Sequence, residues 1–209
     1  MDNTNFDHIM TTTRSVRKRL DFAKPIDRKV IEECIDIALQ APSGSNRQGW
    51  HFMVVTDAAK RKAIADQYRE LFTAYSTSPQ AEYPADDPRS EQQPKVRDSA
   101  TYLAEHMHEC PVFIIPCIEG RPMGPGTQAG FWGSILPAAW SLMLALRSRG
   151  LGTAWTTIHL GKEAESSKLL GIPENVSQAV LFAVAHFTGD DFKVATRLPA
   201  SQVTHWDSW

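Results

Sequence analysis

The alternation of apolar and polar residues predicts helices and strands in a mixed order along the chain. After Asp27, which can cap a helix, apolar residues recur at helical spacing as far as Leu39. Pro42 ends this helix, because a proline pushes the preceding residue out of the helical region. Residues 50–55 are aromatic and β-branched, which predicts a buried strand, and residues 58–75 predict an amphipathic helix.

The second half of the chain continues this mixture. Its pattern predicts, in order, a helix at 97–108, a strand at 112–118, a glycine- and proline-rich loop at 120–126, a long buried helix at 130–149, a strand at 151–157, a short helix at 162–170 and a strand at 178–187. Short βα alternation with glycine-rich turns is absent, so a doubly wound nucleotide-binding fold is not expected. The predicted fold class is α+β.

Residues 76–96 interrupt this order. The segment carries four prolines and many charges, and it is too long and too polar for an internal connection. We expect it to be a mobile lid inserted into one domain that spans residues 1–209.

Charge and composition narrow the class of protein. The formal net charge of the 209 residues is -2, with acidic and basic residues interspersed, so no overall field would draw the chain to nucleic acid or to an anionic membrane. The longest apolar run, near residues 135–146, is broken by Pro137 and Ser141, and the start of the chain is polar. We therefore expect no membrane span and no export signal.

The cysteines and tryptophans add two further expectations. Cys34, Cys110 and Cys117 are odd in number and lack CxxC spacing, which indicates reduced core thiols and a cytoplasmic protein. Two of the six tryptophans lie in the last four residues. Because chain ends usually fray, an aromatic tail indicates docking on an apolar surface such as another subunit.

The densest basic patch contains Arg14-Ser15-Val16-Arg17. It can be a solvated turn, since surface charge runs are common. It can also be an anion site, because a guanidinium matches a phosphate with two hydrogen bonds and a serine hydroxyl can donate to phosphate or ribityl oxygens. The motif alone does not decide between these readings.

A second candidate lies between the predicted helix and strand. The loop Pro42-Ser43-Gly44-Ser45-Asn46 combines a glycine, which lets backbone approach a flat ring, with hydrogen-bonding side chains. An ordinary polar turn has the same composition.

Four motifs in this order resemble the FMN-dependent nitroreductase family: RSVR, APSGSNRQGWHFMVV, RGLGTAWTT and a closing Arg197-Leu198-Pro199 before Val203-Thr204-His205-Trp206. The resemblance covers about residues 10–206. It implies a central, mainly antiparallel sheet flanked by helices, an intertwined homodimer and bound FMN. It also implies NADH or NADPH as electron donor and a small organic acceptor such as a nitroaromatic or quinone.

The resemblance also implies site residues. By position, the following residues of this chain correspond to the family's FMN contacts: Arg14, Ser15, Val16, Arg17, Pro42, Ser43, Gly44, Asn46, Trp155, Thr156, Thr157, Lys193 and Arg197. In the family the basic residues hold the phosphate, and the PSGxN loop reaches the flavin of the partner subunit. Thr157 is the candidate for a hydrogen bond to flavin N5, the atom that gives and takes hydride.

Three features of the sequence leave alternatives open. Thr156-Thr157 resembles the iodotyrosine deiodinase branch, which makes a reductive dehalogenase an alternative, yet Glu82-Tyr83-Pro84 does not reproduce that branch's substrate-binding lid. Trp140 can narrow the pocket or pack in the core. A narrowed pocket would favour a flavin reservoir or redox sensor without turnover.

No metal site is expected. His106 and His108 point to different faces of a helix, and the histidines at 159, 186 and 205 have no carboxylate or cysteine at ligand spacing.

Overall fold

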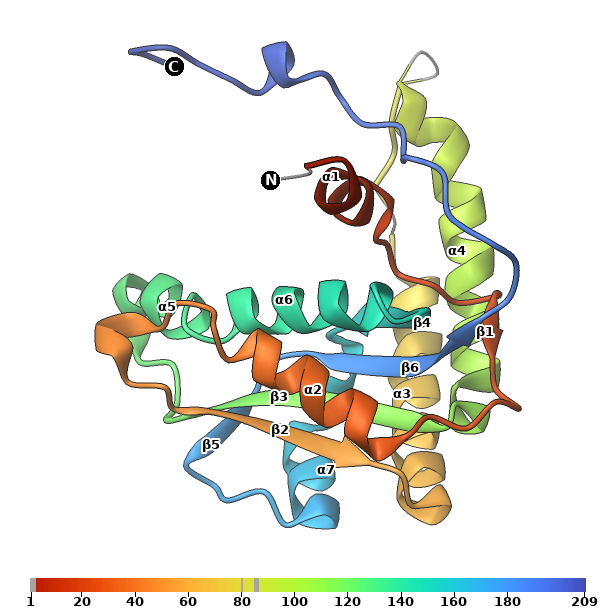
Figure 1. Ribbon diagram of the computed structural model, residues 1–209, viewed down its shortest axis with the longest axis vertical. Coiled ribbons are helices and arrows are strands. Elements are labelled where there is room, and N and C mark those ends of the chain that lie inside the picture. The colour runs from red at the N-terminus through yellow and green to blue at the C-terminus, as the bar shows by residue number, and fades with distance from the viewer. Residues whose placement is uncertain (1–2, 80, 85–86) are drawn as a thin grey trace.

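The computed structural model describes residues 3–79, 81–84 and 87–209 and places one antiparallel sheet between two layers of helices (Figure 1). The helices are α1 (Asn3–Thr12), α2 (Arg28–Ala38), α3 (Ala58–Thr77), α4 (Pro88–His106), α5 (Gly124–Trp132), α6 (Leu136–Arg147) and α7 (Glu163–Leu170). The strands are β1 (Leu20–Asp21), β2 (Trp50–Val55), β3 (Val112–Glu119), β4 (Leu151–Thr156), β5 (Val176–Gln178) and β6 (Leu181–Phe187). Short 3-10 turns cover Gly44–Asn46, Met107–Glu109, Ile158–Lys162 and Ala200–Gln202.

The sheet confirms the predicted fold class. The long strands lie in the order β4-β6-β3-β2. The short strand β1 pairs with the end of β6, and the short strand β5 pairs with the end of β3. Each of these ladders is antiparallel, with Thr153 opposite Val184 and Val54 opposite Ile114.

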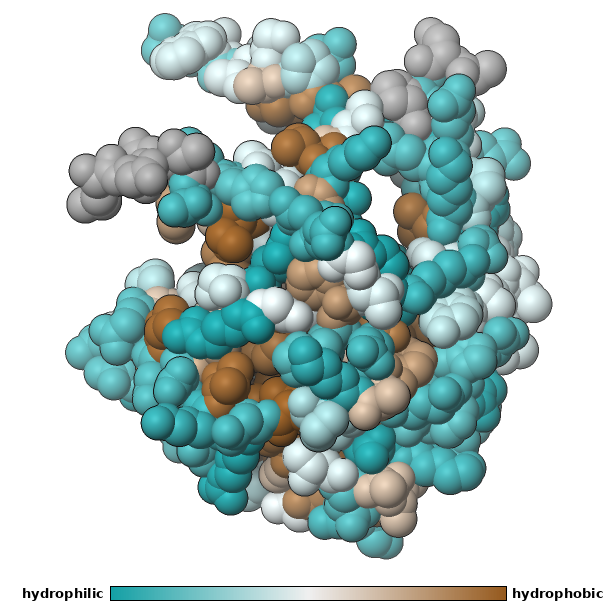
Figure 2. Space-filling view, turned by 45° about the vertical axis from the view of Figure 1, so that its right-hand side comes forward, coloured by the Kyte–Doolittle hydropathy of each residue, from teal (hydrophilic) through white to brown (hydrophobic). Residues whose placement is uncertain are grey.

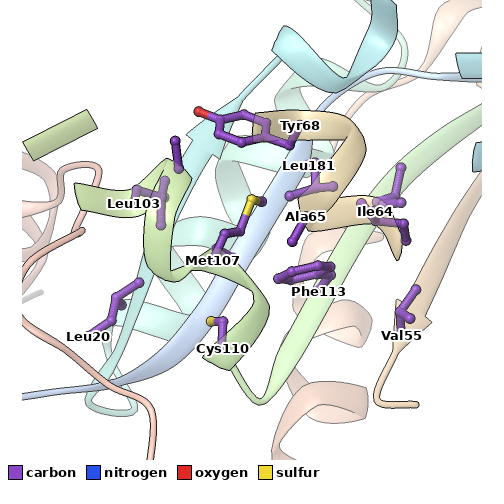
Figure 3. Packing of buried hydrophobic residues seen from close by; sticks show 14 of the residues in the cluster. Leu20, Val55, Ile64, Ala65, Tyr68, Leu103, Met107, Cys110, Phe113 and Leu181 are labelled. Atoms are coloured by element: carbon purple, nitrogen blue, oxygen red, sulfur yellow. The ribbon is translucent and has the colours of Figure 1, made fainter. Parts of the chain in front are cut away.

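Each face of the sheet carries its own apolar core, because successive residues of a strand point to opposite faces. Phe113 and Ile115 of β3 pack with α3 and α4, and Figure 3 shows Tyr68 at the margin of that cluster. Ile114 packs on the other face with α2 and α6. The sheet is thus buried on both sides, and the ends of its strands remain available for a site.

Local signals explain several helix ends. The Asp27 carboxylate accepts a hydrogen bond from the Lys29 amide at 2.9 Å and begins α2 as predicted. Asp57 caps α3 in the same way. Gly171 ends α7 in the left-handed region at φ 71°, which a glycine adopts without strain.

The predicted long helix over 130–149 is wrong in two respects. The chain forms two helices that break at Gly133, where a Cβ would lie 2.6 Å from the Ala129 carbonyl oxygen. Pro137 then sits in the first turn of α6, the place in a helix that tolerates proline. No residue of α5 is buried, whereas α6 fills the core. Together Gly124–Arg147 is long and apolar enough to cross a membrane by length and composition alone, a criterion that core helices also meet.

The irregular segment predicted at 76–96 is shorter in the structure. Helix α3 runs to Thr77 and α4 begins at Pro88, because Asp87 caps it and a first-turn proline lacks only an N–H that would be unpaired anyway. Pro94 lies inside α4. Residue 80 and residues 85–86 of the expected lid lie outside the described residues.

Helix α1 and the C-terminal tail stand apart from the sheet on the same side of the molecule (Figure 1). Both expose apolar side chains, including Phe6 at 63% and Trp206 at 83% exposure. Figure 2 shows apolar surface on this protruding part and on the body below it. Such unpartnered apolar area in a chain with two filled cores is typical of a subunit interface.

Candidate functional site

The segment Arg14-Ser15-Val16-Arg17 runs along β4. The Val16 amide donates to the Thr153 carbonyl at 2.7 Å, and the Trp155 amide donates to the Ser15 hydroxyl oxygen at 3.3 Å. Two motifs about 140 positions apart in the sequence therefore form one wall. Val16 itself is buried and packs against Gly152, so its side chain belongs to the core and only its backbone can face a ligand.

The basic motif lines a cavity of about 490 Å³. We call it the cationic cavity; its lining consists of Arg14, Ser15, Val16, Arg17, Lys18, Arg19, Ser99, Asp191, Phe192 and Lys193. Arg14 and Arg17, the predicted phosphate ligands from the basic motif, line this cavity together with Lys193 from the C-terminal tail.

Arg14 lies among other cations. Burial lowers its pKa first, and the charges of Arg197, Arg19 and Arg147 lower it further. Its Nη2 donates to the Lys193 carbonyl, while its buried Nε has no hydrogen-bond partner within the described residues. An anion would supply both the missing acceptor and the missing negative charge.

Aromatic rings and one carboxylate hold the neighbouring arginines. The Arg19 and Arg147 guanidinium carbons lie 4.2 and 5.1 Å from the Phe192 ring centre. Asp191 accepts from Arg147 and pairs with His8 at 2.7 Å. The sequence reasoning missed Arg147, which approaches the motif only because α6 ends beside β6.

A second cavity, of about 460 Å³, begins where the cationic cavity ends. We call it the aromatic cavity; its lining consists of Arg17, Tyr68, Phe72, Tyr75, Ser76, Gln93, Val96, Arg97, Ala100, Thr101, Leu103, Trp155, Thr156, Thr157 and Ile158. Arg17 lines both cavities and donates to Ser99 at 3.4 Å. Burial lowers the pKa of this guanidinium. The two cavities therefore join at one half-buried arginine.

The two threonines at the end of β4 have different roles in the structure. Thr156 is 8% exposed; its hydroxyl oxygen accepts from the Ile158 amide at 3.3 Å and shares a hydrogen bond with Tyr68. Burial raises the pKa of the Tyr68 phenol, and the bond to Thr156 and the charge of Arg17 offset part of that rise. Thr157 is exposed and its side chain lines the cavity. Of these two threonines, Thr157 is therefore the one whose hydroxyl is available to a ligand.

The turn that carries Thr157 rests on a buried histidine. His159 is 2% exposed, and neither ring nitrogen has a hydrogen-bond partner in the described part of the chain. Burial lowers its pKa to about 4, so the ring is neutral near pH 7.

The loop with Pro42, Ser43, Gly44 and Asn46 lies elsewhere. Its residues 43–45 line a third cavity, of about 580 Å³, together with α5, and no described residue of this lining also lines the cationic or aromatic cavity. The Gly44 amide donates to the Ser134 hydroxyl at 2.9 Å. Within one chain the loop and the basic motif are thus not brought together.

Arg197 is close to the basic motif but lines a different hollow. It forms a cavity of about 350 Å³ with Thr196, Leu198 and the start of α4. Its charge still lowers the pKa of Arg14. The tail therefore approaches the cationic cavity from outside.

Other residues considered from the sequence pack in the core. Trp140 joins the cluster between α2, α6 and the sheet and lines none of the cavities described above. The three cysteines are buried and unpaired, as expected, and burial raises the pKa of Cys110 and Cys117 to about 12. Among residues 3–79, 81–84 and 87–209, no three His, Cys, Asp or Glu side chains gather as metal ligands.

Sequence reasoning missed the aromatic walls and the polar groups of α4. Tyr68 and Phe72 are four residues apart on α3, and Gln93 and Arg97 are four apart on α4. This spacing places each pair on one helix face, but only the fold shows that the two faces enclose a cavity.

Comparison with known proteins identifies the family. The profile of the nitroreductase family matches residues 10–186. A 4-nitrobenzoate reductase of Pseudomonas putida is 30% identical over 169 residues, which are 71% of this chain and 70% of that protein.

Solved structures share the fold. Iodotyrosine deiodinase bound to FMN and 3-iodo-L-tyrosine superposes with a TM-score of 0.74 at 20% identity, covering 98% of this chain and 99% of that one. A variant of an FMN and NADPH-dependent nitroreductase from sphigopyxis sp. strain HMH gives a TM-score of 0.71 at 22% identity, with coverages of 97% and 99%.

These matches define the class of protein as a nitroreductase-fold oxidoreductase. Because the family profile spans most of the sequence, the chain belongs to the nitroreductase family, and the expected resemblance is confirmed.

Proposed function

We propose that this protein binds FMN across the cationic and aromatic cavities and catalyses reduction of a small organic acceptor with electrons from NADH or NADPH. The observation that carries the proposal is the junction at Arg17, which joins a cavity rich in cations to one walled by aromatic rings. FMN has the matching division between an anionic phosphate and a flat ring.

The residues present fit the phosphate end. The buried Nε of Arg14 has no hydrogen-bond partner among the described residues, and burial together with the charges of three further arginines lowers the pKa of the Arg14 guanidinium. Charge-assisted hydrogen bonds from guanidinium groups are the strong form of phosphate binding. Ser15 accepts from Trp155, which leaves its own hydroxyl proton for a ribityl or phosphate oxygen.

The residues present also fit the ring end. When bound, FMN supplies the hydride chemistry that protein side chains lack. The chain contributes Thr157, whose exposed hydroxyl we assign to flavin N5, and Trp155, whose backbone lies beside it on the same wall. Tyr68 and Thr156 fix the turn that carries Thr157. Tyr68, Phe72 and Trp155 give the ring apolar surface to pack against.

We further propose a homodimer in which the loop at 43–46 completes the partner's flavin site. Within one chain this loop lines a separate cavity beside α5, a helix without a buried residue. The exposed apolar residues of α1 and the tail give such a dimer its contact surface.

The names of relatives support the choice of donor and acceptor. The Pseudomonas putida relative is a 4-nitrobenzoate reductase, and one structural neighbour is described as NADPH-dependent. A reservoir without turnover loses its main support, since Trp140 packs in the core and does not narrow either cavity. A halogenated acceptor is included among the test substrates because an iodotyrosine deiodinase shares the fold.

The test begins with purification. We expect a yellow dimer whose flavin absorbance is bleached by NADH or NADPH without oxygen and restored by a nitroaromatic, a quinone or a halogenated phenol. Sedimentation of Trp206→Ser should show a weaker dimer. Protein that purifies without flavin and binds none on titration contradicts the proposal, and yellow protein that no donor reduces supports the reservoir instead.

A further inference from the structure

A polar cavity adjoins the aromatic cavity at helix α4. It has a volume of about 480 Å³, and its lining consists of Ala81, Glu82, Tyr83, Ser90, Gln93 and Arg97. Gln93 and Arg97 also line the aromatic cavity. These two side chains of α4 therefore stand at the boundary between a space for a ring and a space for a polar group.

Arg97 is exposed, and within the described residues its guanidinium has no hydrogen bond or ion pair. The other arginine of the aromatic cavity, Arg17, already donates to Ser99 of α4 and also lines the cationic cavity. The aromatic cavity thus has two guanidinium groups, one shared with the cationic cavity and one, on α4, shared with the polar cavity.

The walls of the aromatic cavity suit an arene. Tyr68 and Phe72 stack with their ring centres 6.0 Å apart, and Phe72 and Tyr75 follow at 6.3 Å. Flat apolar walls with a few convergent polar groups are typical of sites for small aromatic ligands. A ring held against these walls would bring a polar substituent within reach of Arg97, which lines the same cavity.

We propose that Arg97, assisted by Gln93, binds the carboxylate of an aromatic acid that serves as the electron acceptor. A guanidinium matches a carboxylate with two parallel hydrogen bonds, and the Gln93 amide adds a donor on the same helix face. Glu82 shares the polar cavity without an ion pair to Arg97 among the described contacts, so a second negative charge on the acceptor is disfavoured. The preferred acceptor is therefore a monoanionic aromatic acid; this inference rests on the proposed function.

The first test compares two acceptors of the same shape, 4-nitrobenzoate and 4-nitrobenzamide, with the FMN-loaded dimer. Arg97→Gln should lower kcat/KM for the acid about 10- to 100-fold, the range of a hydrogen bond to a charged group, and change the amide less than about 3-fold. Lys95→Gln is the matched control, because it removes one exposed charge from the same helix but lines neither cavity.

The second test measures binding without turnover. Calorimetric titration of the oxidised dimer with benzoate should give a Kd at least about 10-fold weaker for Arg97→Gln and unchanged for Lys95→Gln. This readout separates the two proposals, since it requires no electron transfer. Wild-type protein that binds benzoate but reduces no acceptor defeats the proposed function and leaves the carboxylate site supported.

Two outcomes overturn the inference. Equal losses for the acid and the amide assign Arg97 a structural role. A slower reduction of the flavin by NADPH, with acceptor kinetics unchanged, assigns the same guanidinium to a phosphate of the donor.

Discussion

The cationic cavity and the aromatic cavity meet at Arg17 but are built from different forces. The first gathers permanently charged guanidinium groups, fixed by cation–π contacts and by pairing of the basic motif with β4. The second is walled largely by aromatic and aliphatic side chains, and the exposed hydroxyl at the end of β4, that of Thr157, belongs to a turn that contains a buried neutral histidine. The difference indicates that the chain separates holding a cofactor from setting its reactivity.

The largest effect should come from removing charge at the cationic end. In Arg14→Ala combined with Arg197→Ala, FMN affinity should fall at least about 100-fold, since each hydrogen bond to a charged group contributes about 1.5–3 kcal/mol. Fluorescence titration of apoprotein with FMN measures the Kd. Arg28→Ala removes an exposed arginine paired with Glu32 and should leave the Kd unchanged. An unaltered Kd in the double variant would falsify the phosphate assignment.

Acid should destabilise the protein through the buried His159 beside the aromatic cavity. The pKa of His159 is about 4 in the folded chain, below its ordinary 6.5, so the unfolded chain binds a proton that the folded chain excludes. The contribution of His159 to stability is complete above pH 6.5 and is lost as the pH falls toward 4, by about 3 kcal/mol in all. Denaturant unfolding at several pH values should show this slope, and His159→Leu should flatten it.

His205→Leu is the control for this slope, because that ring lies exposed in the tail. A wild-type stability that stays constant between pH 7 and pH 4.5, or a slope that survives in His159→Leu, contradicts the interpretation. The arginines of the cationic cavity keep their charge throughout this range.

The threonine pair should divide stability from reactivity. Thr156→Val removes a buried hydroxyl bonded to Tyr68 and should lower the free energy of unfolding by about 1–2 kcal/mol. Thr157→Val should leave stability within about 0.5 kcal/mol and slow flavin reoxidation about 5- to 10-fold. Stopped-flow absorbance and chemical unfolding measure the two quantities. If Thr156→Val alters the flavin kinetics and Thr157→Val does not, the hydrogen bond to flavin N5 is assigned to Thr156 instead of Thr157.

The smallest effect is expected at a cation that only borders the cationic cavity. Lys18 is exposed and pairs with Asp98 at 2.5 Å, an arrangement that contributes little in water. Lys18→Ala should change the FMN Kd less than about 3-fold in the same titration. A loss as large as that of Arg14→Ala would mean that total charge, not geometry, holds the phosphate.

The sequence predicted those parts of the fold that depend on local signals. The cap at Asp27, the helix end at Gly171 and the apolar strand at 112–119 each depend on residues close by in the sequence, and the structure confirms all three. The break at Gly133 and the start of α4 at Pro88 were mispredicted because prolines and glycines serve equally in loops and in first turns.

The site divides in the same way. The basic motif was recognisable because its residues are adjacent, and the fold gathers Arg14, Ser15 and Arg17 around one cavity. Arg147 approaches Arg14, and Arg97 lines the aromatic cavity, through tertiary packing of α6 and α4, which no short pattern encodes. The contribution of the loop at 43–46 depends on a second chain and stays a prediction.

That loop also has a thermodynamic consequence. Ser45, Asn46 and Gln48 have φ of 53°, 53° and 52°, a left-handed backbone that costs an ordinary residue roughly 1–2 kcal/mol. Glycine at position 45 or 48 would relieve that strain. The wild-type loop is therefore less stable than the same loop with glycine at these positions would be. Substituting glycine at these two positions is therefore a route to a more heat-resistant form of this protein. Any activity lost in such a variant would measure what the side chains of Ser45 and Gln48 contribute to function.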